Sequence, residues 1–366
     1  MAAPRLRALV VSDFGHFLSA RPEAEIFLGL HRAGVAVDAM TGAGSEYARR
    51  FREAGMRVVD FLAPPGIRRS AVRRIREELV RGNHQVLFLL NNDAIRNGVW
   101  AAVGLSVKVV AYRGVVGNVH PWDPTAWLKI LHPRIDRVVC NAEAVAASVR
   151  RSLVLRRGRV LAIPRGHDLA WYEGVRPAGR AGLGVPEGAF AVAAIANARK
   201  VKGLRYLLEA TYLVRRPIHL VLIGRDLDPP AFRRLVEESP MRERIHVLGY
   251  RDDPLPVTAA CDALVLPSLS EGHPKAVIEA MCLGRPVVIT DIPGPREIVV
   301  GGEDGRVVPP RDPAALAAAL DGLAADPDGA RRMGESARER IRTSFRHEDT
   351  VRAYRALVEE LAGEPR

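Results

Sequence analysis

The sequence contains few cysteines, and they are widely separated. Cys140, Cys261 and Cys282 are the only three in 366 residues, which indicates neither a disulfide framework nor a cysteine metal site. No apolar run reaches the ~18 residues of a membrane-spanning helix, and residues 1–14 are typical of a first strand, not of a signal peptide. We therefore expect a cytoplasmic protein without disulfides.

Aromatic residues are also scarce, at 5% of the chain. This is too few for the stacking surfaces that bind single-stranded nucleic acid, and no recognised nucleic-acid-binding motif is present. The ten histidines form no His-x-x-x-His pair, and no Gly-x-Ser-x-Gly sequence occurs. Neither a histidine metal site nor a serine hydrolase is therefore indicated, and we expect no nucleic-acid partner.

Lysine is rare as well, with five lysines among 54 basic residues. A coding preference for arginine would explain this ratio. The net charge of +12 is unevenly distributed. Residues 1–170 contain 26 basic and 14 acidic residues, whereas residues 171–366 contain 28 of each. The surplus in the first half predicts an anionic partner, which could be nucleic acid, a membrane surface or an acidic substrate.

Short runs rich in Val, Ile and Leu alternate with longer segments of helical period along the whole chain. This alternation predicts an α/β protein with two doubly wound, Rossmann-like parallel sheets. Pro and Gly cluster at 164–188 and mark the boundary. We expect a basic first domain over 1–168, a second over 169–345, and a C-terminal helix, 346–366, that could return to the first domain. Such domain pairs bind ligands between them, at the carboxyl ends of the strands.

Two short motifs have plain structural explanations. Gly42-Ala-Gly44 lacks the third glycine of a dinucleotide-binding loop, so a turn is the better interpretation. Asp226-Leu-Asp228 follows the predicted strand 218–223 and could hold a divalent ion against a diphosphate, or could be a polar loop. No third ligand lies nearby in the sequence, and we expect neither a metal nor a cofactor.

A longer motif joins a predicted strand, 263–266, to a predicted helix, and reads Ser-Leu-Ser-Glu-Gly-His-Pro-Lys-Ala-Val-Ile-Glu over 268–279. Pro274 suits the first helical position. Three amides would then form a positive helix end that attracts phosphate, those of Lys275, Ala276 and Val277. Glu271 and Glu279 flank that end, which suits hydroxyl groups on both sides of a diphosphate. A capped helix with two solvated glutamates is the alternative.

Cations occupy the corresponding place after the predicted strand 190–196, where residues 197–203 read Asn-Ala-Arg-Lys-Val-Lys-Gly. Arg199 could bind phosphate oxygens through two donors, and Lys202 could bind them as a point charge. Solvated surface charge is the alternative explanation for both residues.

Together these segments resemble the retaining glycosyltransferases of the two-domain GT-B fold, specifically glycosyltransferase family 4. Glu271 and Glu279 match the family's Glu-x7-Glu motif, and Arg199 with Lys202-Gly203 matches its Arg…Lys-Gly diphosphate clamp. The resemblance covers most of 160–345 in register. Its further matches are Ile163–Asp168, Ile223-Gly224, Val247–Gly249, Leu283–Val288, Asp291–Glu297 and Val308–Asp312.

The resemblance implies that the second domain binds a nucleotide diphosphate sugar. Glu279 would then hold the ribose hydroxyls. Glu271 would hold the sugar hydroxyls, beside the amides of Gly272 and His273.

The same resemblance implies that Arg199 and Lys202 stabilise the charge that develops on the leaving diphosphate. Such cations can replace a metal ion, so we expect none. We expect the nucleotide base near Tyr250 and Arg251, in the loop after the predicted strand 245–249.

The first domain departs from the family in two loops. Many members have a Gly-Gly pair after the first strand, whose backbone approaches the donor phosphates; this loop has Gly15 and His16 instead. Many also carry a histidine after a middle strand, near the reacting sugar. Arg113 occupies the comparable place, and His120 is the nearest histidine. The resemblance therefore implies that Gly15 and His16 take part in donor binding. It implies that Arg113 or His120 takes part in catalysis.

In function, the resemblance implies a metal-independent, hexosyltransferase-like enzyme. It would move a sugar, with retention of configuration, to a cell-envelope glycan or lipid-linked acceptor, as in lipopolysaccharide or polysaccharide biosynthesis. An inactive scaffold or nucleotide-sugar sensor on the same fold is the first alternative. Epimerisation or phosphorolysis of sugars and a basic nucleic-acid-binding protein are the others.

Residues 67–79 predict a helix whose apolar face is bordered by five arginines: Arg68, Arg69, Arg73, Arg74 and Arg76. Such a helix suits peripheral attachment to anionic lipid at the inner face of the membrane. A covering helix with a charged outer face would show the same pattern.

Overall fold

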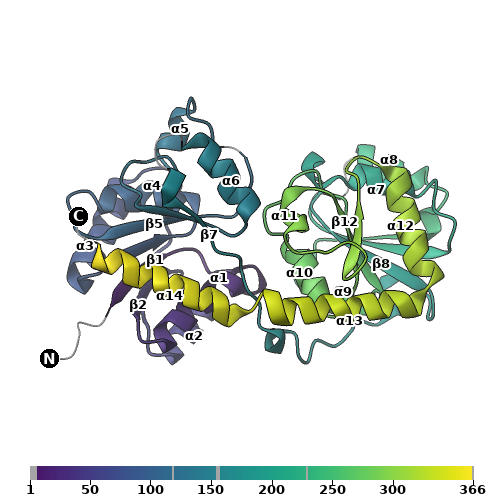
Figure 1. Cartoon of the computed structure of the whole chain (residues 1–366), viewed down its shortest axis with the longest axis horizontal. Helices are drawn as coiled ribbons and strands as arrows, with labels where there is room; N and C mark the ends of the chain where they lie inside the picture. The colour runs from purple at the N-terminus through teal and green to yellow at the C-terminus, as the bar shows by residue number, and fades with distance from the viewer. Residues whose placement is uncertain (1–5, 118, 154–156, 228–229, 365–366) are drawn as a thin grey trace. The chain divides into compact units, whose positions relative to one another are not determined.

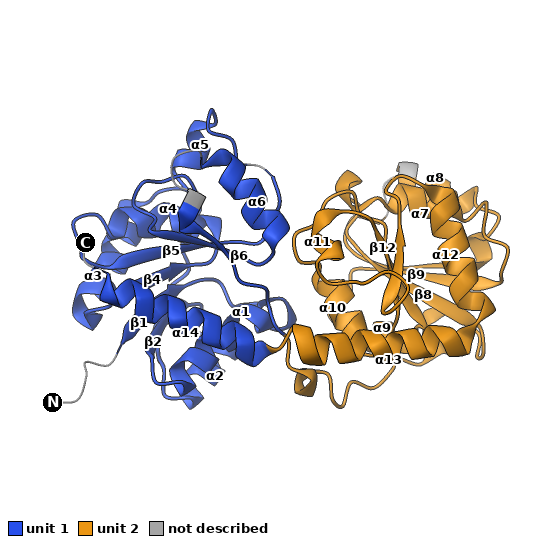
Figure 2. Ribbon diagram, viewed as in Figure 1, with its two compact units in different colours: residues 1–166, 347–366 blue, residues 167–346 orange. Residues whose placement is uncertain are grey.

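The computed structural model describes residues 6–117, 119–153, 157–227 and 230–364 (Figure 1). The chain divides into two compact units (Figure 2). Unit 1 contains residues 1–166 and 347–366, and unit 2 contains residues 167–346. No helix among the described residues is both long enough and apolar enough to cross a bilayer.

Unit 1 is built on a seven-stranded sheet with the order β3-β2-β1-β4-β5-β6-β7. All neighbouring strands are parallel. The strands are β1 (Arg7–Val11), β2 (Ala36–Thr41), β3 (Arg57–Asp60), β4 (Val86–Leu89), β5 (Lys108–Arg113), β6 (Arg137–Cys140) and β7 (Val160–Ala162). The order reverses beside β1 and β4, as in other doubly wound sheets.

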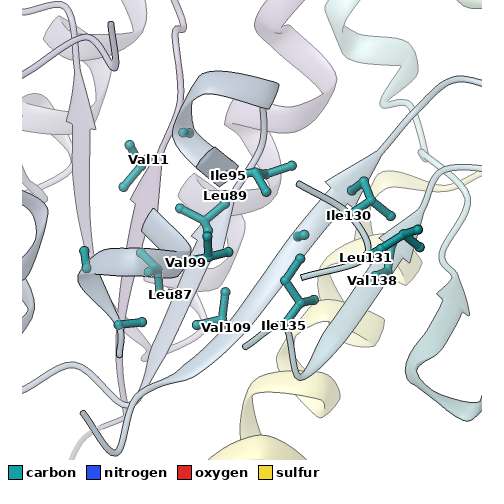
Figure 3. Close-up of a cluster of buried hydrophobic side chains, with 14 of the residues drawn as sticks. Val11, Leu87, Leu89, Ile95, Val99, Val109, Ile130, Leu131, Ile135 and Val138 are labelled. Atoms are coloured by element: carbon teal, nitrogen blue, oxygen red, sulfur yellow. The ribbon is translucent and has the colours of Figure 1, made fainter. Parts of the chain in front are cut away.

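Helices cover both faces of this sheet, which is why its central strands β1 and β4 are almost entirely apolar. Along β1, Leu9 and Val11 belong to the core on one face, where Figure 3 shows Val11, whereas Ala8 and Val10 belong to the core on the other. The helices of unit 1 are α1 (Phe17–Arg32), α2 (Glu46–Glu53), α3 (Arg69–Gly82), α4 (Asn92–Ala101), α5 (Pro124–Trp127), α6 (Glu143–Ser152) and α14 (His347–Gly363).

The C-terminal helix α14 packs within unit 1, against α1 (Figure 1). The Tyr354 ring contacts Phe27 and Phe88, with ring centroids 6.3 and 5.9 Å apart. Gly29 of α1 permits the close approach of α14, because a Cβ at Gly29 would lie 2.5 Å from a methyl group of Val351. Arg137 adds an ion pair with Glu360 (2.6 Å).

Unit 2 contains a six-stranded parallel sheet with the order β10-β9-β8-β11-β12-β13. Its strands are β8 (Phe190–Ile195), β9 (Ile218–Ile223), β10 (Ile245–Gly249), β11 (Ala263–Leu266), β12 (Val287–Thr290) and β13 (Gly305–Val308). Its helices are α7 (Leu204–Ala210), α8 (Pro230–Glu237), α9 (Pro254–Ala260), α10 (Lys275–Cys282), α11 (Pro293–Arg296), α12 (Pro313–Ala325) and α13 (Pro327–Ser344).

The predicted fold class, two doubly wound parallel α/β domains, is confirmed. The first helix starts earlier than its helical period indicates, since that period predicts a helix over 23–33, after Pro22. The helix instead begins at Phe17 and contains Pro22. The Phe17 ring stacks on Tyr47, with centroids 5.3 Å apart, and this packing favours the earlier start.

All three cysteines are buried and free. Burial raises the pKa of the Cys140 and Cys261 thiols to about 12, and it raises the pKa of Cys282 as well. The thiols are therefore protonated at neutral pH and pack as small apolar side chains.

Candidate functional site

Two loops of unit 2, after β8 and after β11, lie against each other. Gly203 has a φ of 65°, and a Cβ at this position would lie 1.9 Å from the carbonyl oxygen of Pro267. The amide of Leu269 donates to the carbonyl of Val201 (2.7 Å). Because β8 and β11 are parallel neighbours, both loops leave the same edge of the sheet, and Gly203 permits their contact.

This contact brings Lys202 and Glu271 together, although 69 residues separate them. Lys202 Nζ lies 2.6 Å from Glu271 Oε1, and both side chains are mostly buried. The Ser268 hydroxyl donates to the same carboxylate oxygen (2.8 Å), while Thr290 donates to the Ser268 carbonyl. The result is a cation and a carboxylate fixed at the carboxyl ends of the central strands.

Gly203 offers a direct test of this loop contact. Gly203→Ala should lower turnover by at least about tenfold, because the backbone would have to move away from Pro267 and take Lys202 with it. Gly188→Ala is the matched control. Gly188 also has a positive φ (78°), but a Cβ added there would have no neighbouring atom within 4 Å. The control should show only the cost of about 1–2 kcal/mol for alanine at positive φ. Equal effects of the two substitutions on turnover would contradict the role of the contact.

The helix after the second loop starts one residue later than the sequence predicted. Pro274 is the N-cap and α10 begins at Lys275. The Val277 amide donates to the Pro274 carbonyl (3.2 Å), so it is not one of the amides available to a phosphate. The amides of Lys275 and Ala276 remain at the positive end of the helix.

Glu279 lies one turn into α10 and is buried, with 6% of its surface exposed. Its carboxylate is 3.2 Å from Lys275 Nζ. A buried carboxylate with one cation beside it can still accept hydrogen bonds from a ligand's hydroxyl groups, as the predicted ribose contact requires.

Gly272 and His273 are held tightly between α10 and neighbouring segments. A Cβ on Gly294 would lie 1.9 Å from the Gly272 carbonyl oxygen and 2.5 Å from that of Glu271. His273 is buried, and its ring centroid is 5.9 Å from that of Phe345. The loop that carries Glu271 is therefore fixed by packing from both sides.

An open pocket of about 740 Å³ lies at the ends of β9 and β10. Tyr250 is exposed at its edge, and the Arg225 guanidinium lies 4.0 Å from the centre of the Tyr250 ring. The side chain of Arg251 is engaged by Asp253 through two hydrogen bonds of 2.8 Å. Tyr250 and Arg225 thus provide a flat stacking surface here, and Arg251 is tied to its own loop.

The remaining polar candidates of unit 2 are exposed. Arg199 precedes the short 3-10 turn Lys200–Lys202 and is solvent-exposed. Asp226 lies in an exposed turn with φ of 58°. Asp228, the other half of the Asp-x-Asp motif, lies outside the described residues.

In unit 1 the two predicted catalytic residues lie in different surroundings. Arg113 ends β5, and its guanidinium donates to the carbonyls of Val115 (3.1 Å) and Gly117 (2.6 Å). Burial lowers the pKa of Arg113. His120 is exposed and stacks on Trp122, with centroids 4.9 Å apart. Arg113 therefore closes its own loop in this structure, and a role for either residue at the reacting sugar stays a prediction.

The loop with Gly15 and His16 borders a pocket of about 230 Å³ at the carboxyl ends of β1 and β4. The Gly15 amide donates to the Asp13 carboxylate (2.8 Å), an oxygen that a phosphate at this amide would have to displace. Glu23 also lines the pocket and bonds to Tyr112 (3.0 Å) and Arg165 (2.6 Å). The described lining residues include no lysine or arginine.

The arginines of α3 do not all face solvent. Of the five arginines predicted to border its apolar face, four are exposed, namely Arg68, Arg69, Arg73 and Arg74. Arg76 is half-buried and donates to the carbonyls of Ala101 (3.0 Å) and Val103 (2.6 Å). These bonds hold the Arg76 guanidinium at the end of α4, and membrane contact by the five arginines stays a prediction.

Comparison with known proteins agrees with this geometry. Residues 189–326, most of unit 2, match the family model described as glycosyl transferases group 1. A D-inositol 3-phosphate glycosyltransferase of Corynebacterium urealyticum is 27% identical over 61% of this chain and 57% of its own length. The lipopolysaccharide core biosynthesis glycosyltransferase LpsD of Rhizobium meliloti is 26% identical over 62% and 65%. The chain thus spans less than two thirds of either relative.

Solved structures extend the likeness to the whole chain. A glycosyltransferase from Rickettsia africae superposes with a TM-score of 0.81, covering 99% of this chain and all of that one at 16% identity. Anabaena HepE in complex with UDP gives a TM-score of 0.78 over 97% and 100%, at 18% identity. At these identities the structures establish the fold, which is GT-B.

Two Rossmann-like units, one with a cation and a carboxylate at the ends of its central strands, thus have the GT-B fold. The family match over residues 189–326 and the curated relatives agree with the resemblance to the family 4 glycosyltransferases noted in the sequence.

Sequence reasoning missed several residues that shape the site. Ser268 and Gly294 lie inside the matched motifs, yet their role is to position Glu271 through a hydrogen bond and a close backbone contact. Arg225 was missed because a single arginine after β9, outside any recognised motif, does not indicate a binding residue. The Arg225 backbone amide donates to Asn197 Oδ1 (2.9 Å), a hydrogen bond that links two strand ends and is visible only in the fold.

Proposed function

We propose that this protein is a retaining glycosyltransferase that uses a nucleotide diphosphate sugar. The single observation that carries the proposal is the Lys202–Glu271 pair, held at 2.6 Å at the strand ends beside the start of α10. A diphosphate placed there would meet Lys202, the first amides of α10 and the exposed Arg199. Positive groups fixed at a leaving diphosphate stabilise the charge that develops in the transition state.

The carboxylates would orient the hydroxyl groups of the donor. Glu271, supported by Ser268, would accept hydrogen bonds from the transferred sugar, and the buried Glu279 would accept them from the ribose. Because Lys202 pairs with Glu271 before the donor arrives, the diphosphate would take over a cation that is already positioned. Pre-positioning lowers the reorganisation needed on binding.

The pocket beside Tyr250 would receive the nucleotide base. Its open volume and the Tyr250 ring, backed by Arg225 at 4.0 Å, suit a planar ligand. Solved neighbours in complex with UDP and UDP-glucose make uridine diphosphate sugars the first donors to test.

The acceptor would be a glycan or a lipid-linked sugar, bound by unit 1. The pocket at the ends of β1 and β4 offers carboxylates, hydroxyls and a tyrosine, through Asp13, Glu23, Ser12, Ser19 and Tyr112. These groups can bind sugar hydroxyls, whereas their negative charge opposes a phosphate. The LpsD relative, named for lipopolysaccharide core biosynthesis, supports a cell-envelope acceptor.

The reaction itself tests the proposal. Incubation with α-linked UDP-sugars should release UDP and yield an α-linked product, as read by proton NMR of the anomeric signal. Turnover should survive excess EDTA, because Arg199 and Lys202 stand where a metal would otherwise neutralise the diphosphate. A β-linked product would contradict retention. Complete loss in EDTA with recovery in Mg²⁺ or Mn²⁺ would contradict metal independence and favour Asp226 and Asp228 as ligands.

We further propose that unit 1 lies at an anionic membrane surface, where a lipid-linked acceptor would be found. Unit 1 has 29 basic and 18 acidic residues, a surplus of 11, whereas unit 2 has 25 and 24. On α3, Arg73 and Arg74 lie 3.8 and 3.6 Å from Glu77 and Glu78. These partners reduce the net charge of the helix, so α3 alone supports only weak, salt-sensitive attraction.

A further inference from the structure

Three of the four tryptophans of the chain are exposed on unit 1. Trp122 is the most exposed, at 79%, followed by Trp127 at 48% and Trp100 at 42%. Val103 and Leu128 are exposed beside them in sequence. We call this set the aromatic face: Trp100, Val103, Trp122, Trp127 and Leu128. In the described part of unit 2, no tryptophan is among the exposed large apolar residues.

The members of the aromatic face come from two segments that are packed together. Trp100, at the end of α4, meets the His132 ring edge-on, with centroids 5.1 Å apart. Arg134 donates to the carbonyl of Ala102 (3.1 Å). The turn after α5 therefore lies against the end of α4, and α5 lies at one end of unit 1 (Figure 1).

The exposure is not that of a loose loop. Ala126, beside Trp127, belongs to the core, as do Ile130 and Leu131 shortly after Leu128 (Figure 3 shows these two). Asp123 caps α5 by accepting from the Thr125 amide (2.9 Å), and the Trp127 indole donates to the Pro121 carbonyl (2.7 Å). The fold thus holds large apolar rings in water, where they are costly unless something covers them.

Basic groups border the aromatic face. Arg76 of α3 bonds to the carbonyls of Ala101 and Val103, which places α3 directly beside Trp100 and Val103. One turn earlier on the same helix, Arg73 is highly exposed. An apolar face with tryptophans and an arginine-rich border is the pattern of a membrane interface, where indole rings lie at the headgroup level and cations meet anionic lipid.

We propose that the aromatic face inserts into the headgroup region of an anionic lipid bilayer, with Trp122 and Trp127 as its anchors. This inference deepens the proposed membrane association, since α3 would supply the attraction and the tryptophans the attachment. The two contributions differ in their response to salt. Attraction by arginine is screened, whereas insertion of indole rings is not.

The test uses the full chain with vesicles of phosphatidylcholine and phosphatidylglycerol (3:1), some carrying brominated acyl chains. Tryptophan emission should shift to the blue, and the brominated lipid should quench it. Vesicles of phosphatidylcholine alone should bind more weakly. Trp122→Ser with Trp127→Ser should lower vesicle affinity by about tenfold or more. Trp171→Phe, in unit 2, is the matched control and should leave it unchanged.

Trp122→Ser alone guards against misfolding, because Trp122 is 79% exposed and stacks on the exposed ring of His120. It should melt like the wild type and still bind vesicles less tightly. Absence of quenching in the wild type, or equal vesicle affinity of the double variant and the wild type, would overturn the proposal. So would a dimer in sedimentation velocity that the double variant lacks, since the face would then contact protein.

Donor binding separates this inference from the proposed enzyme function. UDP binding measured by calorimetry should be equal in the wild type and in both tryptophan variants. A chain that binds vesicles but no nucleotide diphosphate would contradict the proposed enzyme and leave the membrane surface standing. A chain that binds UDP but no vesicles would contradict the membrane surface and leave the proposed enzyme standing.

Discussion

Lys202→Ala is expected to lower turnover by about two to three orders of magnitude, the usual effect of removing one group that stabilises developing negative charge. The fold should be unaffected, because Lys202 bonds to Glu271 through its ammonium group and the backbone contact at Gly203 remains. Steady-state turnover of the donor and the melting temperature should be measured together. Arg199→Ala should act in the same direction.

Lys200 provides the matched control for this substitution. It lies in the same short turn, two residues before Lys202, but it is exposed. Lys200→Ala should therefore keep near wild-type turnover. If Lys202→Ala lost stability in proportion to activity, or if Lys200→Ala were equally inactive, Lys202 would be a structural or merely solvated charge.

Glu271→Gln should change turnover and UDP binding in opposite directions, because Glu271 would orient the transferred sugar and also pairs with Lys202. Turnover should fall by about a hundredfold, because the carboxylate that orients the sugar loses its charge. Binding of UDP, which lacks the transferred sugar that Glu271 would orient, should become tighter by up to about fivefold. Lys202 would no longer be held by an opposite charge 2.6 Å away. Calorimetry with UDP and turnover of a UDP-sugar measure the two effects.

Glu279→Gln supplies the contrast, since Glu279 is expected to bind the ribose. This substitution should weaken UDP binding by about tenfold or more, the scale of a hydrogen bond to a charged group. Opposite signs for the two glutamates would support their separate roles. Weaker UDP binding in both variants would mean that Glu271 also contacts the nucleotide.

Much of the fold could be predicted because it follows from local patterns. Apolar runs such as Ile218–Ile223 form strands buried on both faces, and the Gly- and Pro-rich segment lies where unit 2 begins. The long helix α13 was missed, because its arginines and glutamates obscure the narrow apolar stripe of Met333, Ala337 and Ile341. The stripe acquires meaning only where α13 packs on α10.

The proposed donor site could be predicted from the sequence for a related reason. Its residues lie directly after strands, and parallel strands bring such residues to one edge of a sheet. The sequence could not predict which residues far apart along the chain come into contact. The 2.6 Å Lys202–Glu271 pair depends on Gly203 touching Pro267. The aromatic face, likewise, depends on α5 packing beside the end of α4.

The most direct test of the central claim is a thermal-shift titration with nucleoside diphosphates, run on the wild type and on Lys202→Ala. One diphosphate, with UDP the first to try, should stabilise the wild type by about 2.7 kcal/mol at a hundred times its dissociation constant. Lys202→Ala should melt at the wild-type temperature without ligand and lose most of that shift. If no nucleoside diphosphate stabilises the wild type, or if Lys202→Ala responds as the wild type does, the donor site proposed at Lys202 and Glu271 is wrong.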